Sequence, residues 1–465
     1  MNEPDPRDDQ WKDMLRAVLG DQAADEVIAS MESQGFDPAN FARMNPNGPD
    51  VSALMGQLRS MLSGAPDGPV NWKIAEQVAR ESITRDGVDT LTNADVEKVK
   101  SNLALANMWL NEATALESSY GPEQAWSRLD WIAHAQSTFR RMTEPVAANL
   151  NRAFSTAMEQ QIAEMPEEMK AMIGGQASTF LNQMMATMTG MQFGAALGEL
   201  AKQSFGSTDT GLPFVEGHTT ALVPANVTEF AEELEASEDE VFLYVAVREH
   251  AHARLFASSA WLRAYLLDTI EAWARDINID MAAVEEQIRG IDMSNPQGMP
   301  EIDLTDVFNP APTDDQKGVL TQLETILALI EGWVCEVTDL ATAGHLPDAA
   351  ALREMFTRRR ATGGPAEVTF GNLVGLELRP RKLREAAAFW KMALEKGDLE
   401  SRDHFWSHPD LLPDSEDLDN PEPFFTTEES DLESEIDDLL AGIFAEDEAG
   451  EKPSGPEEPL PPTSN

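Results

Sequence analysis

The sequence predicts a mainly α-helical protein with at most a small β-sheet and an acidic C-terminal tail. Between about residues 70 and 413, apolar residues recur at i, i+3, i+4 and i+7, the spacing of one face of a helix. Only one short run, Phe214–Val223, has the Thr and Val content of a strand. After residue 413, acidic residues, Pro and Ser dominate, a composition typical of disordered segments.

Length and local composition divide the 465 residues into three parts. Residues 1–62 have the pattern of a small helical unit, and residues 63–425 comprise a Gly- and Pro-rich linker followed by a multi-helix body. Residues 426–465 form a largely disordered acidic tail. Within the tail, a short amphipathic helix is expected near 430–444, with an apolar stripe of Leu432, Ile436, Leu439, Leu440, Ile443 and Phe444. That helix either folds back on its own body or docks into the groove of a protein partner.

The charge and cysteine content exclude several function classes. The formal net charge of −48 repels phosphate backbones and anionic lipids, so we expect neither a nucleic-acid nor a membrane partner. A single cysteine, Cys335, excludes a disulfide framework and Cys-rich zinc modules. The N-terminal residues lack the basic and apolar regions of a secretory signal, so we expect a cytoplasmic protein. The oligomeric state is left open.

Long stretches such as 94–118, 125–142 and 259–289 carry the helical pattern, and helices are also expected over 239–256 and 318–342. Another apolar stretch, 172–200, is interrupted by Gln and Asn side chains and is therefore expected to be a buried soluble helix. Gly190, Gly194 and Gly198 recur within it at four-residue spacing, which favours close packing against another helix.

The helix predicted over 239–256 carries charged residues on the same face as apolar residues, and these apolar residues indicate that the face is buried. A zinc-dependent peptidase helix has the pattern His-Glu-x-x-His, in which both histidines bind zinc and the glutamate polarises a water molecule. The corresponding residues here are Arg248, Glu249 and His252, so arginine stands where the first histidine would be. Arginine stays protonated and cannot bind zinc. His250 does not replace it, because it lies about 200° around the helix from His252.

The helix predicted over 318–342 supplies a further candidate. Glu331 flanks its apolar stripe, and a glutamate from a second helix is a usual third zinc ligand. Arg248 is an alternative partner for Glu331, in which case the two would form a salt bridge. Glu336 and Asp339 follow on the same helix and are candidates for supporting the zinc ligands.

The chain resembles an uncharacterised, mainly actinobacterial family of zincin-like metallopeptidases over roughly residues 65–425. The resemblance is carried by VREHAHARLF (247–256), LIEGWV (329–334), RRRATGGPAEVTFGNLVGLELRPRKLREA (358–386) and RDHFWSHPDLLPDSEDLDNP (402–421). It implies Glu249 as the catalytic base, His252 and Glu331 as metal ligands, and zinc as the cofactor. The chain is most similar to the branch of the family in which His-Glu-x-x-His is degenerate.

Three functions follow from these residues. The first is a family member with a degenerate zinc motif and weak or no peptidase activity. The second is an active zinc-dependent hydrolase that uses Glu249 as base with His252 and Glu331 as ligands. The third is a non-catalytic scaffold that binds a partner through its cleft or through the helix at 430–444.

Seven basic residues cluster within 358–384 of an otherwise acidic chain: Arg358, Arg359, Arg360, Arg379, Arg381, Lys382 and Arg384. Because the field of the whole molecule disfavours nucleic acid, we expect these cations to pair with carboxylates of the body or to receive the acidic tail.

Overall fold

In the computed structural model, residues 68–163, 167–275 and 314–425 are described, apart from a few positions between elements (86, 88–89, 209–210, 216, 235, 362, 375 and 377–379). The side chains of 157–181, and of residues 275, 314–315, 361, 365–367, 372 and 374, are likewise outside the description. The helix expected in 1–62 and the one expected near 430–444 both lie outside the described residues.

The described residues form a mainly α-helical fold, as the periodicity predicts. The helices in chain order are α5 (Trp72–Thr84), α6 (Asn93–Leu110), α7 (Arg128–Ala163), α8 (Glu167–Gln203), α9 (Pro224–Glu233), α10 (Glu238–Ser258), α11 (Ala260–Arg275), α14 (Asp314–Thr342), α15 (Ala349–Ala361), α16 (Pro365–Val374), α17 (Leu383–Lys396), α18 (Leu399–His404) and α19 (Ser415–Asp419). Two short 3₁₀ turns, Phe405–Ser407 and Pro409–Leu411, separate α18 from α19.

The small sheet consists of two parallel strands in the described part of the chain. β2 (Thr220–Leu222) lies inside the run that the sequence analysis assigns to a strand, and it pairs with β1 (Glu123–Ala125). The backbone of Gly206 also bridges to Leu222 on the antiparallel side. The sheet therefore brings the segment after α8 against β2, beside α10.

Helix α10 is the central element of the fold. It packs against α6, α9, α11, α14 and α15, and nearly every residue from Val241 to Leu255 is buried. Glu238, Asp239 and Glu240 occupy its first turn, where acidic side chains interact favourably with the helix dipole. Because α10 is enclosed on all sides, its charged residues at 248–254 lie inside the protein rather than on its surface.

Helix α6 ends earlier than its apolar pattern suggests, at Leu110 rather than near 118. The guanidinium of Arg254 on α10 is buried there and donates to the backbone carbonyl of Asn107, 2.7 Å away, and to the side-chain oxygen of Asn111, also 2.7 Å away. The last carbonyls of a helix have no partner within the helix, so this contact stabilises the end of α6.

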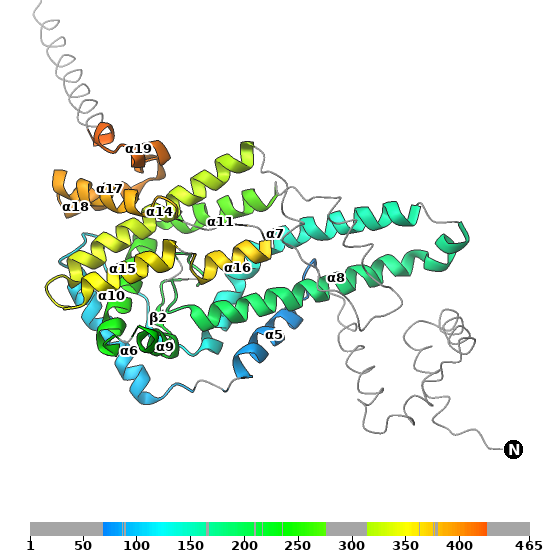
Figure 1. The fold of residues 1–465 in the computed structure, drawn as a ribbon, viewed down its shortest axis with the longest axis horizontal. Helices are drawn as coiled ribbons and strands as arrows, with labels where there is room; N and C mark the ends of the chain where they lie inside the picture. Colours follow the sequence, from blue (N-terminus) through cyan, green and yellow to red (C-terminus); the bar gives the residue numbers. More distant parts are fainter. Residues whose placement is uncertain are drawn as a thin grey trace, which may run out of the picture. The chain divides into compact units, whose positions relative to one another are not determined.

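The glycines of α8 pack against α5, and Figure 1 shows the two helices side by side. A Cβ atom at Gly190 would overlap the backbone of Asn71, one at Gly194 the backbone of Ala75, and one at Gly198 the side chain of Ser82. The close approach that the glycine spacing favours is therefore made within this chain.

Helix α14 passes the length and apolarity test for a membrane span over Gln316–Thr342. However, 67% of its most apolar window is buried against the rest of the protein, as in a core helix.

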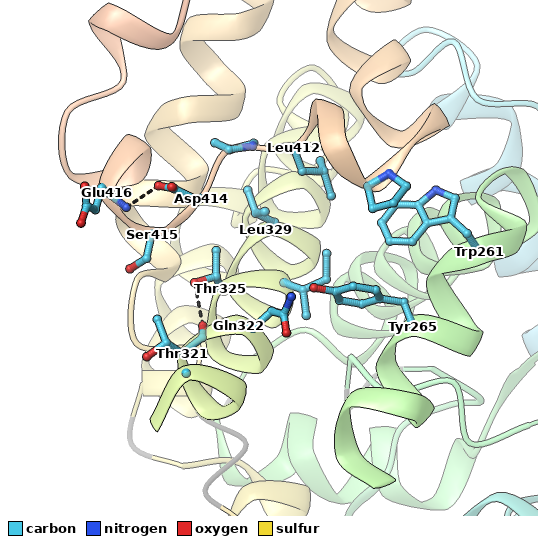
Figure 2. A pocket seen from close by; sticks show the side chains of 14 residues that line it. Trp261, Tyr265, Thr321, Gln322, Thr325, Leu329, Leu412, Asp414, Ser415 and Glu416 are labelled. Atoms are coloured by element: carbon cyan, nitrogen blue, oxygen red, sulfur yellow. Dashed lines mark hydrogen bonds between the residues drawn. The ribbon is translucent and has the colours of Figure 1, made fainter. Parts of the chain in front are cut away.

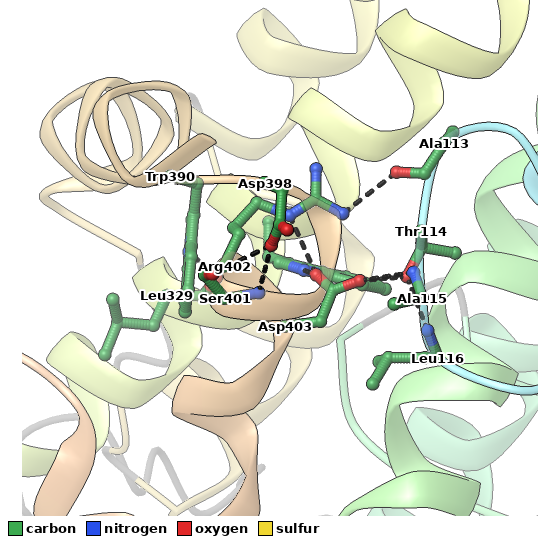
Figure 3. Close-up of polar contacts among 11 residues, drawn as sticks. Ala113, Thr114, Ala115, Leu116, Leu329, Trp390, Asp398, Ser401, Arg402 and Asp403 are labelled. Carbon is green, nitrogen blue, oxygen red and sulfur yellow. Dashed lines mark hydrogen bonds and ion pairs between the residues drawn. The ribbon is translucent and has the colours of Figure 1, made fainter. Parts of the chain in front are cut away.

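A second group of buried charged residues, Arg402 and Asp403, forms hydrogen bonds that connect α18 to the rest of the body (Figure 3). The carboxylate of Asp403 accepts hydrogen bonds from the Thr114 hydroxyl (2.5 Å), the Ala115 backbone N–H (2.7 Å) and the Trp333 indole (2.8 Å). Arg402 is fully buried beside it and donates to Asp403 and to the carbonyl of Ala113. These contacts join α18 both to α14 and to the segment after α6.

We predict that Gly194→Ala lowers the free energy of unfolding by about 1–3 kcal/mol, because the added methyl group overpacks the contact between α8 and α5. The matched control is Gly371→Ala in α16, where a Cβ atom meets nothing within 4 Å. There the change should be neutral or stabilising by up to about 1 kcal/mol, since alanine is the better helix former. Urea unfolding of both variants measures the difference, and equal effects would contradict this account of the glycines.

Candidate functional site

Glu331 is the centre of the candidate site. It projects from α14 and is 2% exposed. Its Oε2 lies 2.7 Å from Arg248 Nη2, and its Oε1 lies 2.5 Å from Arg360 Nη2 and 3.1 Å from His252 Nε2. Three helices thus converge on one carboxylate: α10 contributes Arg248 and His252, α14 contributes Glu331, and α15 contributes Arg360.

Both arginines strongly favour the ionised form of Glu331. Burial alone would raise its pKa, but Arg360 and Arg248 hold the pKa of Glu331 well below its ordinary value of 4.5. Burial likewise disfavours the charge on Arg248, and Glu331 overcomes this and raises the pKa of Arg248 above its ordinary value. The centre is therefore a buried ion pair that stays charged at neutral pH.

His252 is fully buried, and its two ring nitrogens face different acceptors. Nδ1 lies 3.0 Å from the backbone carbonyl of Arg248, and Nε2 lies 3.1 Å from Glu331 Oε1. A carbonyl and a carboxylate can only accept, so a neutral ring can donate to one of them alone. If Nδ1 carries the proton, Nε2 presents the lone pair that a metal-binding histidine uses.

Glu249 lies on the same helix but contacts the segment that follows α8. Its Oε1 accepts a hydrogen bond from the Ser207 hydroxyl and one from the Thr208 backbone N–H at 2.8 Å. A Cβ atom at Gly206 would overlap this carboxylate, so that segment covers Glu249 closely. A second glycine, Gly211, has a positive φ of 72°, and a Cβ atom there would lie 2.9 Å from Glu331 Oε1.

The remaining predicted residues lie in different surroundings. Glu336 and Asp339 on α14 both pair with Arg353 of α15, with Glu336 Oε1 2.8 Å from Arg353 Nη2. Partial burial raises the pKa of Asp339 to about 6. His250 points away from His252, and its Nε2 lies 3.2 Å from Glu123 Oε1 on β1.

The donor set does not fit a zinc ion. Arg248 cannot act as a ligand, and both oxygens of Glu331 already accept from guanidinium groups. The two arginines balance Glu331 and Glu249 in charge, so a divalent cation would add two uncompensated positive charges to a buried site. Within the described ranges, no three His, Cys, Asp or Glu side chains are grouped so as to hold a metal ion.

Sequence reasoning missed Arg360, Ser207 and Thr208 as individual members of the site. Arg360 belongs to the basic cluster, whose members were expected to pair with carboxylates of the body, but nothing in its spacing singles out Glu331. Other members of the cluster also contact the body: Arg358 pairs with Glu354, Arg381 with Glu324, and Lys382 with Asp419. Ser207 and Thr208 lie in a segment that matches no motif.

Cys335 is buried one turn from Glu331, with its sulfur 3.6 Å from Arg248 Nη1. Burial raises the pKa of this thiol. The thiol therefore stays protonated, and its contact with Arg248 is a packing and hydrogen-bonding contact.

A cavity of about 560 Å³ lies away from this centre, between α11, α14 and residues 409–416 (Figure 2). Trp261, Tyr265 and Leu329 form apolar parts of its wall. Two of its polar groups are already used: Asp414 accepts from the backbone N–H of Glu416, and the Thr325 hydroxyl donates to the carbonyl of Thr321. The wall of this cavity is therefore about as polar as it is apolar, and the described residues that line it include no histidine or cysteine.

Comparison with known proteins gives a family and a fold. A family model described as "Zincin-like metallopeptidase" matches residues 70–425. No curated protein matches the chain. A crystal structure from Chloroflexus aurantiacus, described as "a putative hydrolase with a novel fold", is similar with a TM-score of 0.54 and 18% sequence identity. The similarity covers 77% of this chain and 99% of that one, and at this identity it shows a shared fold alone.

We predict that Glu331→Gln lowers the free energy of unfolding by about 3–5 kcal/mol at pH 7, because it leaves two buried guanidinium groups without a counter-charge. The pKa of Glu331 is lowered on folding, so its contribution is complete above about pH 4.5 and decreases as the pH falls toward the folded value. The difference between wild type and variant should therefore be constant from pH 7 to about 5 and shrink below about 4.5.

The matched control for this prediction is Glu336→Gln on the same helix. Its partner Arg353 is 38% exposed and retains Asp339, so the cost should be under about 1 kcal/mol. Denaturant unfolding across the pH range measures both variants. Equal costs for the two substitutions would contradict the assignment of Glu331 as the buried charge centre.

Proposed function

This chain belongs to the zincin-like metallopeptidase family, and we propose that it is a non-hydrolytic member in which arginine takes the place of the catalytic metal. The observation that carries the proposal is the contact of Arg248 and Arg360 with both oxygens of Glu331. Glu331 is the residue that the family resemblance assigns as a zinc ligand. Its carboxylate is held here by fixed positive charge from the protein itself.

The electrostatic consequence of this arrangement supports the proposal. A zinc centre needs neutral or anionic ligands and an open position for water or substrate. The Glu331 centre has two cations, a carboxylate held by both and almost complete burial of every member. Both guanidinium groups would have to leave Glu331 before a metal and a water molecule could enter.

The same geometry leaves Glu249 without a catalytic task. In the family, a glutamate at this position would act on a metal-bound water molecule. Here Glu249 is fully buried and accepts hydrogen bonds from Ser207 and Thr208. We propose that Glu249 serves to hold the segment after α8 against α10.

One observation favours the alternative of an active zinc hydrolase. His252 Nε2 and Glu331 Oε1 are 3.1 Å apart, a separation that two ligands of one zinc ion can have. In that case Arg248 and Arg360 would have to leave Glu331 when the metal binds, with Glu249 as base. The alternative therefore requires breaking two buried ion pairs, and we favour the non-hydrolytic function.

In a non-hydrolytic protein the remaining role is binding, and we propose that this chain acts as a cytoplasmic scaffold for a protein partner. We also propose that it belongs to the branch of the family with a degenerate zinc site, because Arg248 stands at the position of the first histidine of His-Glu-x-x-His. The net charge of −48 supports a partner with a basic surface rather than nucleic acid or an anionic membrane.

We predict that wild-type protein, purified without chelators and dialysed against zinc, holds less than about 0.1 zinc ion per chain. It should also show no zinc-dependent hydrolysis of peptide substrates, and Glu249→Gln should leave any residual rate unchanged. Metal analysis and a peptidase assay measure this. Near-stoichiometric zinc that is lost in both His252→Ala and Glu331→Ala would refute the proposal.

A designed pair of variants tests whether the guanidinium groups are what excludes the metal. Arg248→His with Arg360→Gln removes both charges and supplies a ligand four residues before His252. Arg248→Ala with Arg360→Gln removes the same charges and supplies none. The first should bind zinc at least about tenfold more tightly than the second, as measured by titration with a zinc indicator. Equal affinities would contradict the role assigned to Arg248.

A further inference from the structure

A cavity of about 590 Å³ lies between α14, α15 and α17, and Cys335 in its wall is one turn of α14 from Glu331. Leu340 and Ala343 line it at the C-terminal end of α14, and Ala387 and Ala388 line it from α17. Leu340 is 45% exposed, which makes it one of the few large apolar side chains on the described surface. The cavity is thus a surface site with an apolar wall.

The acidic and basic residues around this cavity differ in whether they have ion-pair partners. Its three carboxylates all have arginine partners: Glu336 and Asp339 contact Arg353, and Glu354 contacts Arg358. Arg384 and Lys391 on α17 are exposed, and within the described part of the chain neither has an ion-pair partner. Among the described residues these two cations therefore have no ion-pair partner, although the chain has a net charge of −48.

Their arrangement on α17 is regular. Arg384 and Lys391 are seven residues apart, so they lie on one face of the helix about 10 Å from each other, with Ala387 and Ala388 between them. Small side chains flanked by two cations form a groove suited to an amphipathic helix with acidic residues at the same spacing.

The chain itself contains such a segment beyond the described residues. Residues 426–465 carry 13 acidic residues and one lysine. In the sequence 430–444, Asp431 and Asp438 are also seven residues apart, and in a helix they flank the apolar stripe of Leu432, Ile436, Leu439 and Ile443. Both the charge and the spacing complement those of α17.

The last described residues place the start of this segment on the same helix. The ring of Phe425 stacks on Phe389 of α17, with centroids 5.1 Å apart, and Lys396 of α17 lies over the Phe425 ring. Five residues lie between Phe425 and Asp431, and the six Cα-to-Cα steps from one to the other can span about 20 Å. A helix is about 10–12 Å across, so this length is enough to pass around α17 to the face that bears Arg384 and Lys391.

We propose that residues 430–444 dock as a helix into the cavity between α14, α15 and α17 of their own chain. The apolar stripe covers Leu340, Ala343 and Ala387, and Asp431 and Asp438 pair with Arg384 and Lys391. The docked segment closes the groove to other acidic helices, so a partner that uses this surface has to displace it. The proposal does not depend on whether the Glu331 centre binds zinc.

Hydrogen exchange of the full-length protein, followed by mass spectrometry, tests this docking. In the wild type, the amides of 432–444 should be protected relative to a peptide of the same sequence. Arg384→Glu with Lys391→Glu should speed their exchange at least about tenfold, because two attractive pairs become repulsive. Adding Asp431→Lys and Asp438→Lys to that variant reverses the charges of the tail segment as well as those of α17, so both pairs are attractive again. Protection should then return to within about threefold of the wild type.

The control for this experiment is Arg80→Glu with Lys202→Glu, which changes the net charge equally at surface ion pairs of α5 and α8. It should leave the exchange of 432–444 unchanged.

A chain that ends at residue 426 gives a second readout. Cys335 lines the cavity, so its alkylation should become faster when the docked segment is removed. Exchange as fast as in the isolated peptide, or protection that depends on protein concentration, would overturn the proposal, the latter by placing a second copy in the groove.

Discussion

The need to neutralise charge inside a helix that is buried on all sides governs this structure. Helix α10 carries Arg248, Glu249, His252 and Arg254 within two turns, and none of the four is more than 4% exposed. Isolated charges at such depth would cost several kcal/mol each, so elements packed against α10 must supply partners for them. Helices α14 and α15 supply Glu331 and Arg360, the segment after α8 supplies Ser207 and Thr208, and α6 supplies the carbonyl that receives Arg254. The packing of the body around α10 is therefore specified by polar contacts as well as by apolar ones.

Much of the fold could be predicted from local patterns, and the reasons for the exceptions are physical. The helical class follows from periodicity and the strand within 214–223 from its Thr and Val content, and the glycine spacing of α8 indicates a close helix neighbour. Periodicity does not say which helix that neighbour is, so α5 could not be identified. The partner strand at 123–125 has only three residues and is distant in sequence, so it leaves no local signal. The last turn of α6, which ends at Leu110, supplies the carbonyl of Asn107 as an acceptor to Arg254, more than a hundred residues later.

The candidate site shows the same division between local and non-local information. Helical spacing places Glu249 and His252 on α10, and an apolar stripe places Glu331 on α14, so the presence of these groups in a buried region is readable from the sequence. Their partners are set by how three helices cross. Arg360 reaches Glu331 only because α15 packs beside both α10 and α14. The basic cluster around Arg360 contains several other arginines, and no feature of the sequence distinguishes Arg360 from them. A motif can therefore name the residues of a centre without naming the counter-charges that decide its chemistry.

The hydrogen bonds of Asp403 have a consequence for how the chain acquires its structure during synthesis. They join α18 to Thr114 and Ala115, at a sequence separation of 289 and 288 residues. A ribosome that adds about 5–20 residues per second needs roughly 15 to 60 s to make the intervening chain. During that interval Thr114 and Ala115 lack the carboxylate that accepts their hydrogen bonds. The neighbouring aromatic side chains of α14 are also more exposed than in the complete structure. The nascent body therefore lacks this buried contact until most of the chain has been made.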